Sequence, residues 1–192
     1  MSSSKRRIGL LTGTFDPVHL GHVAMGRVAM RECVLDEVWF LVNPEPGHKV
    51  GVVGFADRLA MARLAVGGER GLSADSGELA DKHHNIDVFL TLIKQHPTDQ
   101  FVFIVGTDVL GQLGDWEDSE RVLREAQFAV ARRERFGEVA LDSRLKVSGF
   151  DLVEHAKASS RAIRSELRAG KRPVELDERV YAYVRERGLY GA

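Results

Sequence analysis

Short apolar runs alternate with helix-like segments along this chain, and the alternation limits the possible folds more than any other feature. The runs occupy residues 8–12, 37–42, 101–105 and 128–131. The first ends at Gly13, the second at Asn43 and Pro44, and the third at Gly106. Runs that are apolar at nearly every position are typical of parallel strands covered on both faces. The pattern therefore predicts an α/β domain built on a parallel sheet.

The segments between and after these runs have the periodicity of helices. In the first of them, Met25, Val28 and Ala29 would share one helical face. Further helices are expected at residues 55–66, 86–93, 160–168 and 177–187. Ligands of such folds bind outside the carboxyl ends of the strands, near a switch in strand order. The loops after Leu11, Val42 and Val105 are therefore expected to face one crevice.

Length and charge limit the organisation and the partners. A chain of 192 residues fits one domain, with residues 1–7 as a flexible N-terminal tail and residues 8–192 as the folded unit. Its 27 Lys and Arg against 28 Asp and Glu leave a formal charge of −1, which disfavours broad nucleic-acid binding. The apolar run after the tail is too short to cross a membrane. Cys33 is the only cysteine, so no intrachain disulfide forms and a cytoplasmic setting is expected.

The loop after the first run carries two histidines three residues apart. From Gly13 it reads Gly-Thr-Phe-Asp-Pro-Val-His-Leu-Gly-His, which places His19 and His22 on one helical face. Gly13 and Gly21 would leave room for a ligand, and the N–H groups of a helix start attract phosphate. A phosphate pocket is one interpretation. From spacing alone, unrelated surface histidines and a metal pair with its third ligand elsewhere stay open.

Several motifs in order give a more specific indication than the histidines alone. Neither G-x-x-x-x-G-K-[ST] nor G-x-G-x-x-G occurs. Instead, the loop resembles the H-x-G-H signature of the nucleotidylyltransferase superfamily, and residues 8–190 resemble bacterial nicotinate-nucleotide adenylyltransferases. The supporting segments are residues 46–49, 106–110, 159–164 and 180–190. The resemblance implies a Rossmann-like, doubly wound parallel sheet in one nucleotidylyltransferase domain.

The resemblance also implies how the triphosphate is held. Adenylyl transfer needs positioning and charge stabilisation more than a covalent nucleophile. The implied catalytic residues are His19, His22, Lys49 and Arg164. The implied ATP contacts are Gly13, Thr14, Phe15, Gly21, Gly106, Asp108, Ser159 and Ser160. Mg²⁺ would be carried by the ATP phosphates, with no metal site on the protein.

Some of these residues also have simpler interpretations. Ser159 and Ser160 precede an apolar-periodic stretch and are expected to cap its helix. Asp108 would contact the ribose by resemblance, but its position also suits an N-cap. Lys49 could equally be a solvated lysine of a loop. Arg161 stands where the family usually has threonine and adds a cation.

The acceptor side departs from the family pattern. The implied acceptor contacts are Asp16, His84, Asn85 and Trp116, with the tryptophan stacking on the pyridine ring. Where the family usually has Tyr-Thr-x-Asp-Thr-Leu, this chain reads His-Asn-Ile-Asp-Val-Phe from His84. The loop at residues 43–47 is also shorter than the usual one. The transfer chemistry is therefore better supported than the identity of the acceptor.

The function that the sequence predicts is condensation of ATP with nicotinate mononucleotide, giving deamido-NAD and pyrophosphate. Alternatives are another acceptor, such as nicotinamide mononucleotide or phosphopantetheine, CTP as the donor, or a nucleotide-binding homologue without turnover. No nucleic-acid or membrane partner is expected, and the oligomeric state is open, a homodimer included. Trp39, Cys33 and the methionines of the first helix are expected in the core.

Overall fold

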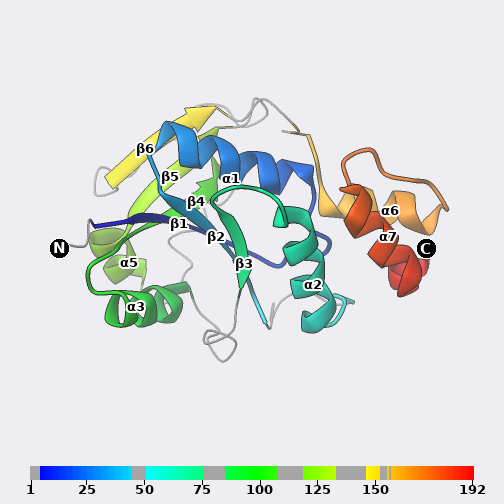
Figure 1. The fold of residues 1–192 in the computed structure, drawn as a ribbon, viewed down its shortest axis with the longest axis horizontal. Coiled ribbons are helices and arrows are strands. Elements are labelled where there is room, and N and C mark those ends of the chain that lie inside the picture. The colour runs from blue at the N-terminus through cyan, green and yellow to red at the C-terminus, as the bar shows by residue number, and fades with distance from the viewer. Residues whose placement is uncertain are drawn as a thin grey trace.

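A single parallel sheet forms the centre of the molecule (Figure 1). The computed structural model describes residues 5–44, 51–75, 85–107, 119–132, 146–151, 155 and 157–192. The strands are β1 (Arg7–Gly13), β2 (Glu37–Val42), β3 (Leu72–Asp75), β4 (Gln100–Gly106), β5 (Gln127–Arg132) and β6 (Lys146–Asp151). Their order is β3-β2-β1-β4-β5-β6, and every neighbouring pair is parallel. The predicted α/β fold is confirmed.

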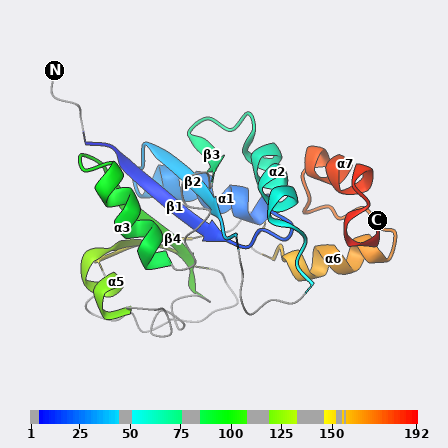
Figure 2. The same ribbon diagram turned by 90° about the horizontal axis from the view of Figure 1, so that it is seen from below.

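Helices cover both faces of this sheet (Figures 1 and 2). Helices α1 (Leu20–Glu32) and α2 (Phe55–Val66) lie on one face, and α3 (Asn85–Gln95) and α5 (Ser119–Glu125) lie on the other. The chain then adds α6 (Ser160–Arg168), α7 (Glu178–Glu186) and the short 3-10 helix η3 (Leu189–Gly191) beside α2. The sheet is therefore wound on both sides, as the sequence predicts.

Alternate strand residues supply two separate cores. In β4, Phe101 and Phe103 pack toward α3, whereas Val102 and Ile104 pack toward α1 and α2. In β1, Ile8 and Leu10 belong to the first of these cores and Leu11 to the second. This is the burial expected of a strand covered on both faces. It explains why the central strands were visible as apolar runs.

The two edge strands were not predicted. Both β3 and β6 pair with a single neighbour. Their sequences, Leu-Ser-Ala-Asp and Lys-Val-Ser-Gly-Phe-Asp, lack the continuous apolar run of a strand buried on both faces. The seven-residue helix α5 was also missed, because it is too short to establish a helical period.

The first strand begins one residue before the expected boundary at residue 8. Arg7 is the first residue of β1, and the carbonyl of Arg6 accepts a bond from the Gln100 N–H at 2.8 Å. The Arg6 guanidinium also pairs with Asp99 at 2.6 Å and with Glu37 at 3.2 Å. Arg7, which was expected in the flexible tail, is therefore part of the sheet, and Arg6 is bound to it.

The expected core residues were mostly placed correctly. Cys33 is buried at the end of α1, and Met25 is buried within that helix. Trp39 is only partly buried, because its indole lies at the margin of the α3 core, where Nε1 donates to Glu37 at 2.8 Å. No helix within the described ranges is long and apolar enough to cross a membrane.

The carboxyl ends of β1, β2 and β4 lie at the same edge of the sheet. The strand order reverses between β1 and β4, which are neighbours although β2 and β3 come between them in the chain. The loops after β1 and β2 are joined there by a bond from Asn43 N–H to the Gly13 carbonyl, 2.9 Å long. The fold thus presents these loops at a switch point, where ligands bind in such sheets.

Candidate active site

His19 and His22 form a stacked pair where the loop after β1 enters α1. His19 is the N-cap and His22 is the third residue of the helix. Their ring centroids are 3.7 Å apart at an interplanar angle of 23°. The His19 N–H donates to Nδ1 of His22 at 3.2 Å, which places the proton of a neutral His22 ring on Nε2. The predicted shared face is confirmed, and the pair also caps the helix.

The first turn of α1 suits an anionic ligand. It contains no acidic residue, and His22 presents a donor nitrogen at the positive end of the helix dipole. His19 is buried and His22 is half-buried. Burial strengthens hydrogen bonds from such groups to a charged ligand, because little water competes. The arrangement can therefore stabilise negative charge on a phosphate.

Phe15 connects the loop to the histidine pair. Its ring is buried and meets His22 edge to face, with centroids 5.0 Å apart. A Cβ on Gly13 would lie 2.9 Å from this ring, so a side chain at that position would displace Phe15. Packing of the Phe15 ring therefore favours glycine at position 13, in addition to any role of Gly13 in ligand approach. Phe15 itself has a φ of 50°, in the left-handed region that most residues avoid.

Gly21 has a comparable packing reason. A Cβ there would lie 2.8 Å from the carbonyl oxygen of His155 and 3.0 Å from Cβ of Ala158. The segment before α6 therefore approaches α1 as closely as it does only because Gly21 has no side chain. In this way Gly21 brings Ser159 and Ser160 toward the histidine pair.

The start of α6 docks on the loop after β1. Ser160 donates its hydroxyl to the carbonyl of Pro17 at 2.9 Å. Ser159 is the N-cap by position, but its side chain makes no capping bond, so the expected side-chain cap is corrected on this point. Arg164 donates from Nη1 to the carbonyl of Asp16, and the same nitrogen lies 3.5 Å from the Asp16 carboxylate. Arg161 is exposed.

Arg58 is a buried guanidinium that sequence reasoning missed. It is 1% exposed and binds four backbone carbonyls, and burial lowers its pKa while Asp16 opposes that shift. The bonds run to Val53 at 3.0 Å, Thr14 at 2.9 Å, Asn43 at 2.6 Å and Pro44 at 2.9 Å. Arg58 therefore holds together the loops after β1 and β2 and the start of α2. The sequence did contain a sign of this burial, because Arg58 lies on the same face of the expected helix as the apolar Phe55 and Ala62.

Asp16 lies in a buried polar cluster. Its Oδ1 accepts a bond from the Tyr190 hydroxyl at 2.7 Å and one from the Val53 N–H at 3.3 Å. Burial, followed by the bond to Asp16, raises the pKa of Tyr190 and keeps its hydroxyl protonated. An acceptor-binding role for Asp16 stays a prediction, because the carboxylate already has these protein partners.

Other expected site residues are placed only in part. Gly106 ends β4 at the switch point, next to the buried Thr107. Asn85 is the first residue of α3, but its side chain is not described. Lys49, His84, Asp108 and Trp116 lie outside the described residues. Within the described part of the chain, no three His, Cys, Asp or Glu side chains are grouped to hold a metal ion.

This sequence is similar to those of known proteins. The family model described as cytidylyltransferase-like matches residues 10–166. A probable nicotinate-nucleotide adenylyltransferase of Geobacillus kaustophilus is 34% identical over 97% of this chain and 87% of the relative. One of Halalkalibacterium halodurans is 37% identical over 96% and 91%. Both relatives span nearly the whole chain.

A solved structure has the same fold at lower identity. Plasmodium falciparum nicotinic acid mononucleotide adenylyltransferase, complexed with NaAD, matches with a TM-score of 0.83 and 18% identity. The match covers 97% of this chain and 98% of that one. At this level of identity the likeness concerns the fold.

Proposed function

Because the chain belongs to the cytidylyltransferase-like family, and within it to the nicotinate-nucleotide adenylyltransferases, we propose that it transfers the adenylyl group of ATP to nicotinate mononucleotide. A phosphate oxygen of the acceptor attacks the α-phosphorus of ATP. The bond from that phosphorus to the bridging oxygen of the β-phosphate breaks, and pyrophosphate leaves. The product is nicotinate adenine dinucleotide. The observation that carries the proposal is the stacked His19 and His22 pair at an acid-free helix start.

The histidines would act on the charge of the transition state. Negative charge builds up on the non-bridging and leaving oxygens as the α-phosphorus becomes pentavalent. Donors already in place stabilise that charge without reorganising. His22 Nε2–H, the His19 ring and the backbone N–H groups of Thr14 and Phe15 are such donors in this proposal. In this role His19 and His22 form no covalent bond with the substrate.

Arg164 would hold the departing pyrophosphate. A guanidinium has five N–H donors, and the described contacts of Arg164 use only Nη1, on Asp16. Its remaining donors, with Ser159 and Ser160 at the start of α6, suit the β- and γ-phosphates. Gly21 would let this segment approach the phosphates, and Lys49 would add a further cation.

The remaining proposed contacts belong to the nucleosides and the acceptor. Gly106 would leave room for the nucleotide beside a ribose held by Asp108, and Trp116 would stack on the pyridine ring. Asp16, His84 and Asn85 would line the acceptor side. Mg²⁺ would enter with the triphosphate, because magnesium often keeps phosphates and water as its ligands. The Asp16 carboxylate is already bound by Tyr190 and Val53, which agrees with a metal carried by substrate.

Pyrophosphate release tests this proposal. Wild-type protein is assayed with ATP and Mg²⁺ and, in parallel, nicotinate mononucleotide, nicotinamide mononucleotide or phosphopantetheine. We expect the highest kcat/KM with nicotinate mononucleotide. A preference for one of the other two would keep adenylyl transfer and correct the acceptor. Folded protein that binds ATP but releases pyrophosphate with none of them would overturn the proposed enzyme.

A further inference from the structure

The Tyr190 hydroxyl reaches the loop between β1 and α1 from the other end of the chain. This loop, residues 14–19, is called the phosphate loop below. It donates to Asp16 Oδ1 across 174 positions of sequence, and that carboxylate is 5% exposed. Tyr190 is half-buried and has a φ of 61° within η3. A non-glycine residue in this region costs energy and persists only where its surroundings fix it. The tyrosine is therefore held in one position rather than resting loosely on the surface.

Tyr190 and Arg164 bind the same aspartate from two sides. The hydroxyl binds Oδ1, while Arg164 Nη1 lies 3.5 Å from Oδ2 and also donates to the Asp16 carbonyl. Without the hydroxyl, Oδ1 would keep only the longer bond from Val53 N–H at 3.3 Å. The carboxylate would then be freer to turn toward Arg164 and form a closer ion pair with it. That pair would compete with phosphate for the guanidinium.

The same contacts determine the shape of the loop that leads to the histidines. Phe15 adopts its left-handed backbone between two fixed neighbours. Arg58 holds the Thr14 carbonyl at 2.9 Å, and Asp16 is held by Tyr190 and Arg164. The Phe15 ring in turn lies edge to face on His22. Movement of Asp16 would therefore displace Arg164 directly and His22 through the Phe15 ring.

We propose that Tyr190 is a positioning residue for adenylyl transfer, acting through Asp16 to fix Arg164 and the loop that carries His19 and His22. This inference rests on the proposed function, in which those groups hold the triphosphate. Tyr190 itself touches no reacting atom in this account. Its hydroxyl contributes by keeping the aspartate from capturing the arginine.

A second tyrosine of the same region provides a matched control. The Tyr183 hydroxyl donates to Asp57 Oδ1 at 2.8 Å, almost the same length as the Tyr190 bond. Both tyrosines are half-buried. The Tyr183 bond joins α7 to α2, however, and Asp57 has Arg187 as its other partner. Removing either hydroxyl deletes one Tyr–Asp hydrogen bond, but only the bond of Tyr190 is made to an aspartate of the phosphate loop.

The experiment compares Tyr190→Phe with Tyr183→Phe at a temperature where urea titrations show both variants fully folded. We expect Tyr190→Phe to lower kcat/KM for ATP by about tenfold or more, within the range that small misplacements of reacting groups produce. Part of the loss should appear as a raised KM for ATP, because Arg164 is diverted. Tyr183→Phe should stay within about twofold of wild type, since one hydroxyl away from the site changes folding but not positioning. Equal activity of Tyr190→Phe and wild type, or equal losses in both variants, would overturn the proposal.

A double mutant shows whether the hydroxyl acts through the aspartate. If it does, adding Tyr190→Phe to Asp16→Ala should cause no further loss beyond that of Asp16→Ala alone. Additive losses would contradict the proposed route. If wild-type protein releases no pyrophosphate, the proposed function fails, and binding of a non-hydrolysable ATP analogue becomes the readout. Weaker analogue binding by Tyr190→Phe alone would then support the positioning role, and unchanged binding would reject it.

Discussion

The loop between β1 and α1 has two sides whose polar groups are held in different ways. On its reactive side, His19 and His22 stack on each other, and the His19 backbone N–H donates to Nδ1 of His22. On its supporting side, Asp16, Arg58 and Tyr190 are linked to several partners from distant segments. In the proposed function the reactive side acts on the triphosphate, and the supporting side keeps the loop in shape.

The largest effect is expected from removing an imidazole of the reactive side. His22→Gln keeps an acceptor at the third helical position, as in a capping box, but loses the ring. We expect kcat/KM to fall by about 10²–10⁴-fold, the range for loss of one charge-stabilising or proton-transfer group. The free energy of unfolding should change by less than about 1 kcal/mol, the typical value of a cap. Pyrophosphate release and urea denaturation measure the two quantities.

His19→Ala and His22→Ala extend this test. Each should lower kcat/KM by at least as much as His22→Gln does, while circular dichroism still reports a folded protein. His22→Ala should be slightly less stable than His22→Gln, because it also removes the acceptor for the His19 N–H. If a folded protein carrying both substitutions, His19→Ala and His22→Ala, kept wild-type activity, the histidines would not be the reactive side.

For Arg58, which holds the loop by four backbone bonds, the larger effect is expected on the free energy of unfolding. Arg58→Met fills a similar volume but leaves the four carbonyls of Val53, Thr14, Asn43 and Pro44 without this donor. Unsatisfied buried groups are costly, although the variant is relieved of burying a charge. We expect a loss of roughly 2–4 kcal/mol in the free energy of unfolding, measured in urea.

Arg63→Met on the same helix is the control for Arg58→Met. Arg63 is exposed and has a 3.4 Å contact with the Ala74 carbonyl, so its loss should cost under about 1 kcal/mol. If Arg58→Met proved as stable as wild type but inactive, Arg58 would belong to the reactive side. The division between the two sides would then be wrong.

The two sides also differ in how far the sequence could predict them. His19 and His22 are three residues apart, so local helical geometry is enough to place them together. The contacts of Arg58 come from positions 14, 43, 44 and 53, and no local pattern records their meeting. Tyr190 and Asp16 are separated by 174 positions. Local chemistry was therefore visible in the sequence, whereas long-range support needed the fold.

The same contrast holds for the sheet. The bounds of β2 were predicted correctly because each of its positions from Val38 to Val42 is apolar. The edge strand β3 has only Leu72 as a large apolar residue, so its four residues resemble a loop. An edge strand has one strand neighbour and less surface to bury, which weakens the hydrophobic signal that sequence analysis uses.

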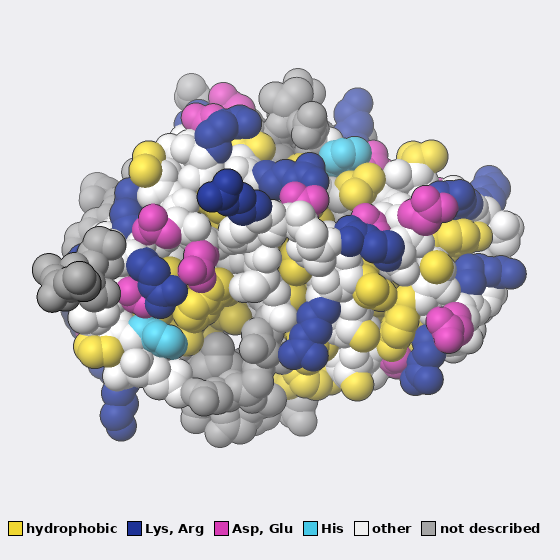
Figure 3. All heavy atoms as spheres, in the orientation of Figure 1, with side chains coloured by type: hydrophobic (Ala, Val, Ile, Leu, Met, Phe, Trp, Pro, Cys, Tyr) yellow, Lys and Arg dark blue, Asp and Glu magenta, His cyan; other side chains and the backbone are white. Residues whose placement is uncertain are grey.

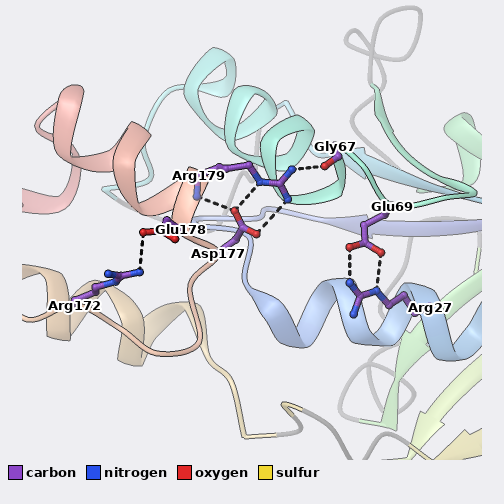
Figure 4. A network of polar contacts seen from close by, with 7 residues as sticks. All are labelled: Arg27, Gly67, Glu69, Arg172, Asp177, Glu178 and Arg179. Atoms are coloured by element: carbon purple, nitrogen blue, oxygen red, sulfur yellow. Dashed lines mark hydrogen bonds and ion pairs between the residues drawn. The ribbon is translucent and has the colours of Figure 1, made fainter.

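Ion pairs that lie away from the loop between β1 and α1 are expected to contribute least to stability and nothing to turnover. Figure 4 shows Arg27 of α1 forming a two-pronged pair with Glu69, and Arg179 of α7 binding Asp177 and the Gly67 carbonyl. In Figure 3, basic and acidic side chains are interspersed over the face in view. Such exposed pairs are screened by water and salt, so each contributes little.

Arg27→Gln should therefore have the smallest effect. The bond from Arg27 holds the pKa of Glu69 below its ordinary value, although burial opposes the shift. A lowered carboxyl pKa contributes stability above the unfolded value of about 4.3, and this contribution is lost as pH falls through the lower folded pKa. At pH 7 we expect a cost under about 1 kcal/mol, since the Arg27 side chain is 52% exposed. The difference from wild type should shrink as the pH falls below about 4.3, and added salt should reduce it at pH 7.

Arg31→Gln, on the same helix, is the matched control for Arg27→Gln. Arg31 pairs with the adjacent Glu32 at 2.8 Å, and these side chains are 73% and 48% exposed. Its loss should cost no more than that of Arg27, because an adjacent exposed pair joins no two elements. Both variants should retain wild-type pyrophosphate release, since the described ion pairs of these arginines run to Glu69 and Glu32 and not to the histidine loop. Reduced turnover in Arg27→Gln would mean that the arrangement of α1 depends on its far end, and the supporting side would then extend along the whole helix.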